Sequence, residues 1–245
     1  MSEMTLKSEY DIRIDWIDKL RGIGIILVFL GHEKIDAGLK IYIYSFHMPL
    51  FFFLSGLVAS ATRENMNFRH FFLKKVRTRL VPYISFGLIT YLLWIAPRII
   101  KWLIGYTSNI SLPEGFISPI DMIIGLLYGS GTDQWLIYNI LLWFLPCLFV
   151  TELLAFVLTR ISKKTSLLLL CIISLAIAGY VDSQYMPFRM PFGGDVALIA
   201  AVFYLTAVGL HPRSWTKYVR VVGRNQSPLK WEKGTCHEAP KEFCC

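Results

Sequence analysis

Long runs of apolar residues, separated by short polar segments, are the feature that most constrains how this chain can fold. A helix that crosses a bilayer needs roughly 17 to 25 mostly apolar residues, and six runs approach that length. The mean hydropathy of +0.51 is higher than a water-soluble fold of this size normally carries. We therefore predict an all-α, polytopic membrane helical bundle of about six transmembrane helices. The six predicted spans are 16–34, 41–60, 80–100, 135–158, 166–181 and 194–211.

A seventh apolar stretch, residues 117–130, is shorter and contains Asp121, Gly125 and Gly129. Its length and its polar residue favour an interfacial or re-entrant segment over another span. The first 21 residues mix acidic and basic side chains and lack the apolar core of a cleavable signal peptide. The first span is therefore expected to serve also as the signal for membrane insertion.

The distribution of basic residues predicts the orientation of the chain, because loops rich in Lys and Arg tend to stay in the cytoplasm. We expect both termini to be cytoplasmic and the protein to be a multi-pass component of the cell membrane, in particular of a bacterial cytoplasmic membrane. The net charge of +8 is then explained by topology and contact with the lipid bilayer, not by nucleic-acid binding. In this orientation, twenty of the 25 Lys and Arg residues lie in cytoplasmic segments, which are 1–21, 61–79, 159–165 and 211–245.

The composition changes near residue 211. Residues 212–245 have neither a helical apolar period nor a run long enough to span a membrane, so we predict a basic, disordered cytoplasmic tail. The tail holds Cys236, His237, Cys244 and Cys245, but their spacing does not match the paired ligands of common zinc modules. We predict no metal site. Structural disulfides are not expected either, since the other cysteines lie in predicted spans.

Two ionisable residues of the first span, Arg21 and His32, are the first candidates for function. Eleven residues advance a helix by about 16 Å and rotate it by three turns plus roughly 20°, so both side chains leave nearly the same face. Ionisable groups inside a membrane bundle are costly unless they meet partners, water or substrate. The alternatives are that Arg21 anchors the helix at the membrane interface and that His32 pairs with Glu33 or a backbone carbonyl.

A second histidine, His47, lies near the start of the otherwise apolar second span. The short connection between the first two spans keeps their ends adjacent, so His32 and His47 are expected at similar depth in the outer half of the membrane. Pro49 removes a helical hydrogen bond close to His47 and favours a cavity there.

A basic run, LKKVRTRLVPY, precedes the third span and contains Lys74, Lys75, Arg77 and Arg79. It is typical of an anchor at the cytoplasmic face. Four cations beside a membrane cavity would also hold a polyanionic ligand such as the phosphates of coenzyme A, with Arg offering bidentate contacts that Lys cannot make.

Taken in order, these segments resemble acyltransferase family 3, the integral membrane O-acyltransferases, and in particular members similar to fucose 4-O-acetylase. The resemblance covers residues 11–211, and we assign residues 1–211 to this domain. Arg21 and His32 match the first-helix motif of the family, and the second span matches its second helix around His47. The matching segments read DWIDKLRGIGIILVFLGH, FHMPLFFFLSG, KKVRTRLVPY, LWFLPCLFVTELL and DVALIAAVFYLTAVGL.

The resemblance implies transfer of an acyl group, usually acetyl from cytosolic acetyl-CoA, to a hydroxyl of a cell-envelope glycan, a lipid-linked sugar or a similar extracytoplasmic acceptor. It implies that His32 is catalytic, as a general base or as a covalent relay, and that Arg21 binds the donor or supports the fold. We add His47 as a second catalytic candidate. Acetyl-CoA would be a co-substrate, and no bound cofactor is expected. The donor-binding candidates are Arg21, Lys74, Lys75, Arg77 and Arg79.

The chain departs from the family in its number of spans, since members generally carry about ten. It is therefore expected to be a shortened relative, which leaves open an inactive descendant or a subunit that needs a partner or a second copy. A transporter is the remaining alternative, because intramembrane His and Arg also mark ion paths. Transporters are typically built from two matched halves, and the sequence has no such internal symmetry.

Overall fold

The computed structural model describes residues 15–61, 67–103, 119–129, 140–162, 164–187 and 189–210. These residues form helices and short connections without any strand, so the all-α prediction is confirmed. The helices in chain order are α1 (Asp15–His32), α2 (Ala37–Ala61), α3 (Phe68–Lys75), η1 (Val76–Leu80), α4 (Val81–Leu103), α5 (Pro119–Tyr128), η2 (Ile140–Trp143), α6 (Phe144–Ile161), α7 (Thr165–Tyr185), η3 (Pro191–Gly193) and α8 (Gly194–Leu210).

Within the described residues, five helical segments are long and apolar enough to cross a membrane. Each contains one of the predicted spans or most of it, and the protein is a multi-pass membrane protein. The first predicted span is also helical, as α1, but the first seven residues of α1 include Asp15, Asp18, Lys19 and Arg21, which shorten its apolar part. The five segments are Ala37–Ser60, Phe68–Pro97, Leu141–Ile161, Thr165–Tyr185 and Pro191–Leu210.

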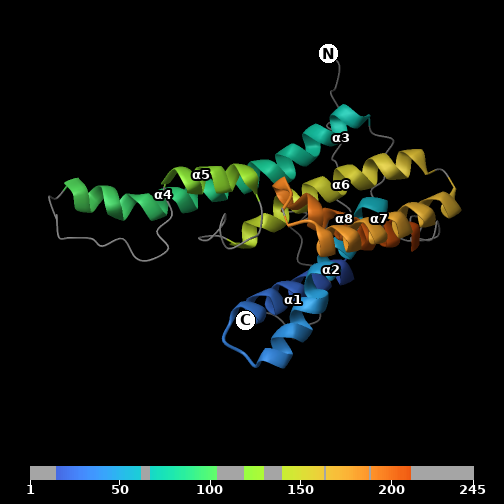
Figure 1. Cartoon of the computed structure of the whole chain (residues 1–245), viewed down its shortest axis with the longest axis horizontal. Coiled ribbons are helices and arrows are strands. Elements are labelled where there is room, and N and C mark those ends of the chain that lie inside the picture. The colour runs from blue at the N-terminus through green and yellow to red at the C-terminus, as the bar shows by residue number, and fades with distance from the viewer. Residues whose placement is uncertain are drawn as a thin grey trace, which may run out of the picture.

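The predicted interfacial segment contains the ten-residue helix α5. At 1.5 Å per residue this helix is about 15 Å long, roughly half the thickness of the hydrocarbon core. It is therefore too short to be a span of its own. It lies alongside α4, and the two form the extended arm of the molecule (Figure 1).

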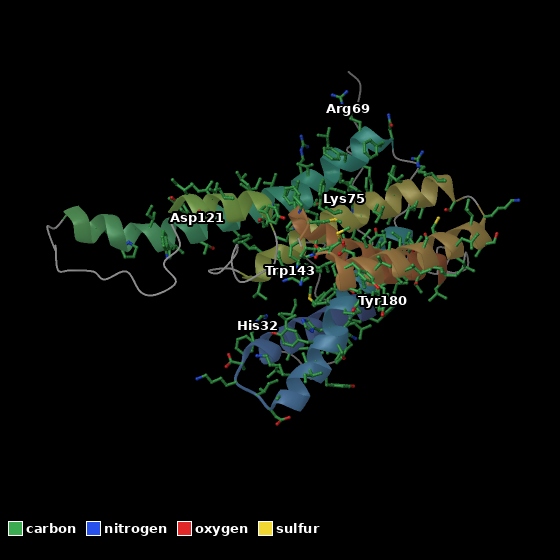
Figure 2. The ribbon with its side chains drawn as sticks, in the orientation of Figure 1. His32, Arg69, Lys75, Asp121, Trp143 and Tyr180 are labelled. Atoms are coloured by element: carbon green, nitrogen blue, oxygen red, sulfur yellow. The ribbon has the colours of Figure 1, made fainter. Side chains whose placement is uncertain are left out.

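Helix α8 lies at the centre of the bundle and packs against α2, α6 and α7. Helices α1 and α2 form a hairpin that leaves the bundle at an angle to α7 and α8 (Figure 1). With side chains drawn, His32 lies on this hairpin, whereas Lys75 lies on the other side of α8, beside α6 (Figure 2). The two groups of candidate residues therefore occupy different parts of the molecule.

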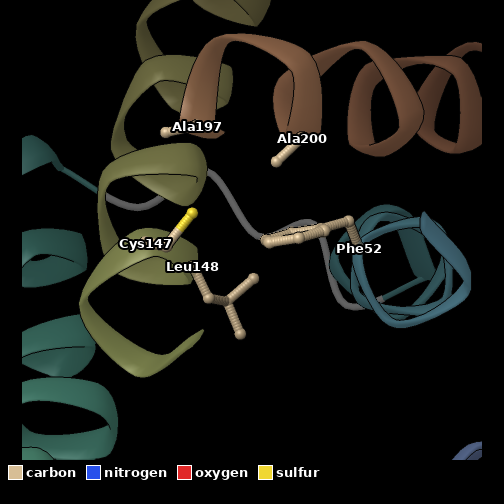
Figure 3. Packing of buried hydrophobic residues seen from close by; sticks show 5 residues of the cluster. All are labelled: Phe52, Cys147, Leu148, Ala197 and Ala200. Carbon is tan, nitrogen blue, oxygen red and sulfur yellow. The ribbon is translucent and has the colours of Figure 1, made fainter. Parts of the chain in front are cut away.

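A hydrophobic core lies where α2, α6 and α8 meet (Figure 3). Phe52 of α2 points between Cys147 and Leu148 of α6 and the side chains of Ala197 and Ala200 of α8. Small residues on α8 allow this close approach, which is how helices commonly pack in membranes, where lipid is as apolar as the side chains.

A glycine on α2 makes an even closer approach to α8. A Cβ atom at Gly56 would lie 2.3 Å from the backbone carbonyl oxygen of Tyr204 and 3.0 Å from the Cβ of Ala207. Neither neighbour can move without moving α8 itself. The contact thus fixes α2, which carries His47, against α8.

Candidate functional site

The α1–α2 hairpin places the two predicted catalytic histidines. Its four-residue connection ends at Asp36, whose Oδ2 accepts hydrogen bonds from the backbone N–H groups of Gly38 at 2.9 Å and Leu39 at 3.2 Å. This side chain caps the N-terminus of α2, where backbone donors have no helical partner. The cap starts α2 directly after α1 and so brings the end of one helix close to the start of the next.

His32 and His47 both contact one aromatic ring, that of Tyr44. The ring centroid of Tyr44 is 6.0 Å from that of His32 and 5.1 Å from that of His47, both in edge contacts. His32 is the last residue of α1 and is exposed, whereas His47 is only 3% exposed. The hairpin thus joins an accessible imidazole and a buried one through Tyr44.

The hydrogen bond of His47 fixes its tautomer. Its Nδ1 lies 2.7 Å from the carbonyl oxygen of Ile43. A carbonyl oxygen only accepts, so Nδ1 must carry the proton, and in the neutral ring Nε2 keeps the lone pair. His47 is therefore oriented by its own helix with a basic nitrogen pointing away from Ile43.

Arg21 is half-buried on α1, and its Nη1 lies 3.4 Å from Oδ1 of Asp18 in the preceding turn. Such partly exposed pairs contribute little to stability. Helix α1 packs against α2, while the basic run lies on α3 and η1, and η1 packs against α6. The predicted donor-binding residues are therefore divided between two regions.

The basic run lies inside a helix and not in a loop ahead of one. The predicted span 80–100 is part of a longer helical segment that begins at Phe68, and the cations occupy α3 and the π-helical turn η1. Turns of this kind are rare and occur frequently at functional sites. The predicted start at residue 80 is too far along the chain, because the first turns of this helix are charged and do not belong to an apolar run.

Two of the four cations bind one buried carboxylate, Glu152 of α6, whose side chain is 1% exposed. Lys75 Nζ donates to Oε1 at 2.8 Å. Arg79 donates from Nη2 to Oε1 at 2.9 Å and from Nε to Oε2 at 3.2 Å, which is the bidentate arrangement that the guanidinium favours. We call these three residues the Glu152 clamp.

Aromatic side chains surround the clamp. Lys75 Nζ lies 5.4 Å from the ring centroid of Phe71, and Phe71 stacks on Phe156 with centroids 4.3 Å apart. The buried Tyr204 of α8 is within electrostatic reach of Glu152 and Arg79. Buried charges in such surroundings are stable only when paired, because desolvation penalises each of them alone.

Sequence reasoning did not select Glu152. It lies within LWFLPCLFVTELL, which entered only as part of the family resemblance. The available signal was an acidic residue in the interior of a predicted apolar span, which by default indicates a partner or a function.

A second buried carboxylate was also missed. Asp195, in the first turn of α8, is 5% exposed, and its Oδ2 accepts a hydrogen bond from Nη1 of Arg189 at 2.8 Å. Its Oδ1 is buried and has no hydrogen-bond partner among the described residues. The turn between them contains Phe192 at φ 56°, a left-handed conformation that is uncommon for a residue other than glycine.

Within the described part of the chain, no cluster of three or more His, Cys, Asp or Glu residues could hold a metal ion. The cysteines of the predicted tail, residues 212–245, lie outside the described residues.

Together, these features define a helical multi-pass membrane protein that carries a histidine pair on one hairpin and a cationic helix turn on another element. The family model of the acyltransferase domain of family 3 matches residues 14–220. The chain therefore belongs to acyltransferase family 3 and is a membrane acyltransferase. No curated protein and no solved structure matches the chain.

Proposed function

We propose that the chain transfers an acetyl group from acetyl-CoA on the cytoplasmic side to a hydroxyl of a cell-envelope glycan or lipid-linked sugar. The proposal includes the resemblance of the chain to fucose 4-O-acetylases. The observation that carries it is the exposed His32 at the end of α1, next to Tyr44 and the tautomer-fixed His47. In a membrane acyltransferase, an accessible imidazole at that position is suited to activating an acceptor hydroxyl.

The reaction is a displacement at the thioester carbonyl. His32 takes the proton of the acceptor hydroxyl as its oxygen bonds to the carbonyl carbon, the C–S bond breaks, and the thiolate of the donor leaves and is reprotonated by the imidazolium. In the covalent alternative, the imidazole nitrogen attacks first and passes the acyl group to the hydroxyl in a second step. His47 would assist from the buried side, as a base or through Tyr44.

The donor would enter from the cytoplasm with its phosphates near the cationic residues and its thioester near His32. Arg21 supports this direction, since it lies about 16 Å from His32 along α1 and on nearly the same face. The basic run supplies further positive charge for phosphate oxygens, which Arg binds in bidentate fashion.

The test is labelled-acetyl transfer by the purified chain in proteoliposomes, combined with mass spectrometry of envelope glycans from cells with and without it. His32→Ala should lower transfer by about 10² to 10⁴-fold, the usual contribution of general acid–base catalysis. His70→Ala is the matched control, because His70 is an exposed histidine on α3. Full activity of the His32 variant would overturn the mechanism.

Three outcomes with the wild-type chain bear on the alternatives. An acetyl mass difference in the glycans would support the proposal and define the acceptor class. If no acetyl is transferred and no difference appears, the chain is inactive under these conditions. Recovery of transfer when the chain is co-purified with a second protein would favour a partner subunit.

A further inference from the structure

Three cations of the basic run, Lys75, Arg77 and Arg79, do not face the same direction. Lys75 and Arg79 are four residues apart, so they lie on one face of the helix, and that face meets Glu152 of α6. Arg77 is midway between them. Two residues correspond to roughly half a helical turn, so Arg77 leaves the helix on nearly the opposite side from each of them.

Burial follows the same division. The side chains of Lys75 and Arg79 are 17% and 29% exposed, and Glu152 is almost completely enclosed. Arg77 is exposed. A polyphosphate ligand that approaches this helix from outside the bundle therefore meets Arg77 before it meets either clamp cation.

The charges make Lys75 and Arg79 poor phosphate ligands. Both oxygens of Glu152 are occupied by their N–H groups. To turn either cation toward a phosphate would withdraw charge-assisted hydrogen bonds from a carboxylate that has no access to water, and an unpaired buried charge is strongly unfavourable.

We propose that Glu152 is a positioning residue for the acyl donor. The clamp neutralises part of the positive charge, locks η1 against α6 and so orients Arg77 outward as the cation that binds the donor phosphates, while Lys75 and Arg79 do not contact them. This assignment rests on the proposed use of a coenzyme A thioester, and it narrows the donor-binding set predicted from the basic run.

Donor binding and turnover separate this role from a purely structural one. Affinity for coenzyme A is measured by calorimetry on the purified chain. KM and kcat are measured with acetyl-CoA and with S-acetylpantetheine, which lacks the nucleotide phosphates. A residue that acts through phosphate contacts changes KM for acetyl-CoA alone, whereas a damaged fold lowers kcat for both donors.

Three variants are informative. Arg77→Gln should weaken coenzyme A binding by about tenfold or more, because it removes a charge-assisted contact. Glu152→Gln should also weaken the use of the donor, seen as a higher KM for acetyl-CoA, since it removes the charge that binds Lys75 and Arg79 and so loosens η1 from α6. The combined variant Glu152→Leu, Lys75→Met and Arg79→Met restores apolar packing between η1 and α6 and should bind coenzyme A within about threefold of wild type.

Arg69→Gln is the control, because Arg69 is an exposed cation on the neighbouring α3 (Figure 2). It should leave affinity and KM unchanged. The assignment is overturned if Arg77→Gln binds coenzyme A like wild type, or if the combined variant loses affinity as strongly as Arg77→Gln does. Failure of the wild-type chain to bind coenzyme A or to use acetyl-CoA would overturn the proposed donor as well, so the two failures are distinguishable.

Discussion

Removing the carboxylate of the Glu152 clamp should be one of the most destabilising single changes in this protein. Glu152→Ala leaves Lys75 and Arg79 on the side of their helix that meets α6, without the anion that binds both. Breaking a buried ion pair by removing one partner typically costs about 3–5 kcal/mol. Three separate hydrogen bonds to charged groups, at about 1.5–3 kcal/mol each, would sum to more than this range, but bonds that share one carboxylate are not additive.

The free energy of unfolding can be measured in mixed micelles, with increasing mole fraction of dodecyl sulfate and tryptophan fluorescence as the probe. The combined variant Glu152→Leu, Lys75→Met and Arg79→Met should be close to wild type, since apolar replacement of a whole buried charge cluster is often neutral or stabilising. Glu33→Ala, at an exposed acid outside the bundle, should change stability by no more than about 0.5 kcal/mol. The reasoning is refuted if Glu152→Ala costs less than about 1 kcal/mol, or if the combined variant is as unstable as the single one.

Two further predictions use the same unfolding assay. Gly56→Ala should cost about 1–3 kcal/mol of unfolding free energy, because the added Cβ would collide with the backbone carbonyl of Tyr204. Gly22→Ala is the control and should be neutral or stabilising, since a Cβ there has no atom within 4 Å. Equal effects of the two changes would contradict the close packing of α2 on α8. Arg189→Ala should cost about 1–3 kcal/mol of unfolding free energy, because it leaves the buried carboxylate of Asp195 without its ion-pair partner. Asp195→Asn should cost less, because it removes the charge itself. The opposite ranking would show that this ion pair does not stabilise the turn.

Run length was sufficient to predict most of the membrane fold. The predicted span 166–181 lies within Thr165–Tyr185, and 194–211 ends one residue beyond Leu210, because an apolar stretch of this length has few stable alternatives to a spanning helix. The basic run was the exception. Its charges excluded it from the search for apolar runs, although the helix continues through it from Phe68.

The part of the candidate site that depends on residues close together in the sequence could be predicted. A short connection between two helices was enough to infer that His32 and His47 are near each other, and both lie beside Tyr44. The clamp could not be inferred in this way. Glu152 is 73 residues from Arg79 along the chain, and without the fold nothing assigns an acid in one span to a particular cation in another.

The two regions of the site are connected through α8. Tyr204 presents its backbone carbonyl to Gly56 of α2 and lies within electrostatic reach of Glu152 and Arg79. Gly56 is nine residues beyond His47, or about 14 Å along the same helix. Because α2 is continuous through Pro49 and Gly56 packs directly on α8, a displacement of α8 would be transmitted along α2 to the histidine pair. In the proposed reaction, a donor whose phosphates lie at Arg77 must also reach the hairpin, and an extended thioester carrier is better suited to this than a small acyl phosphate.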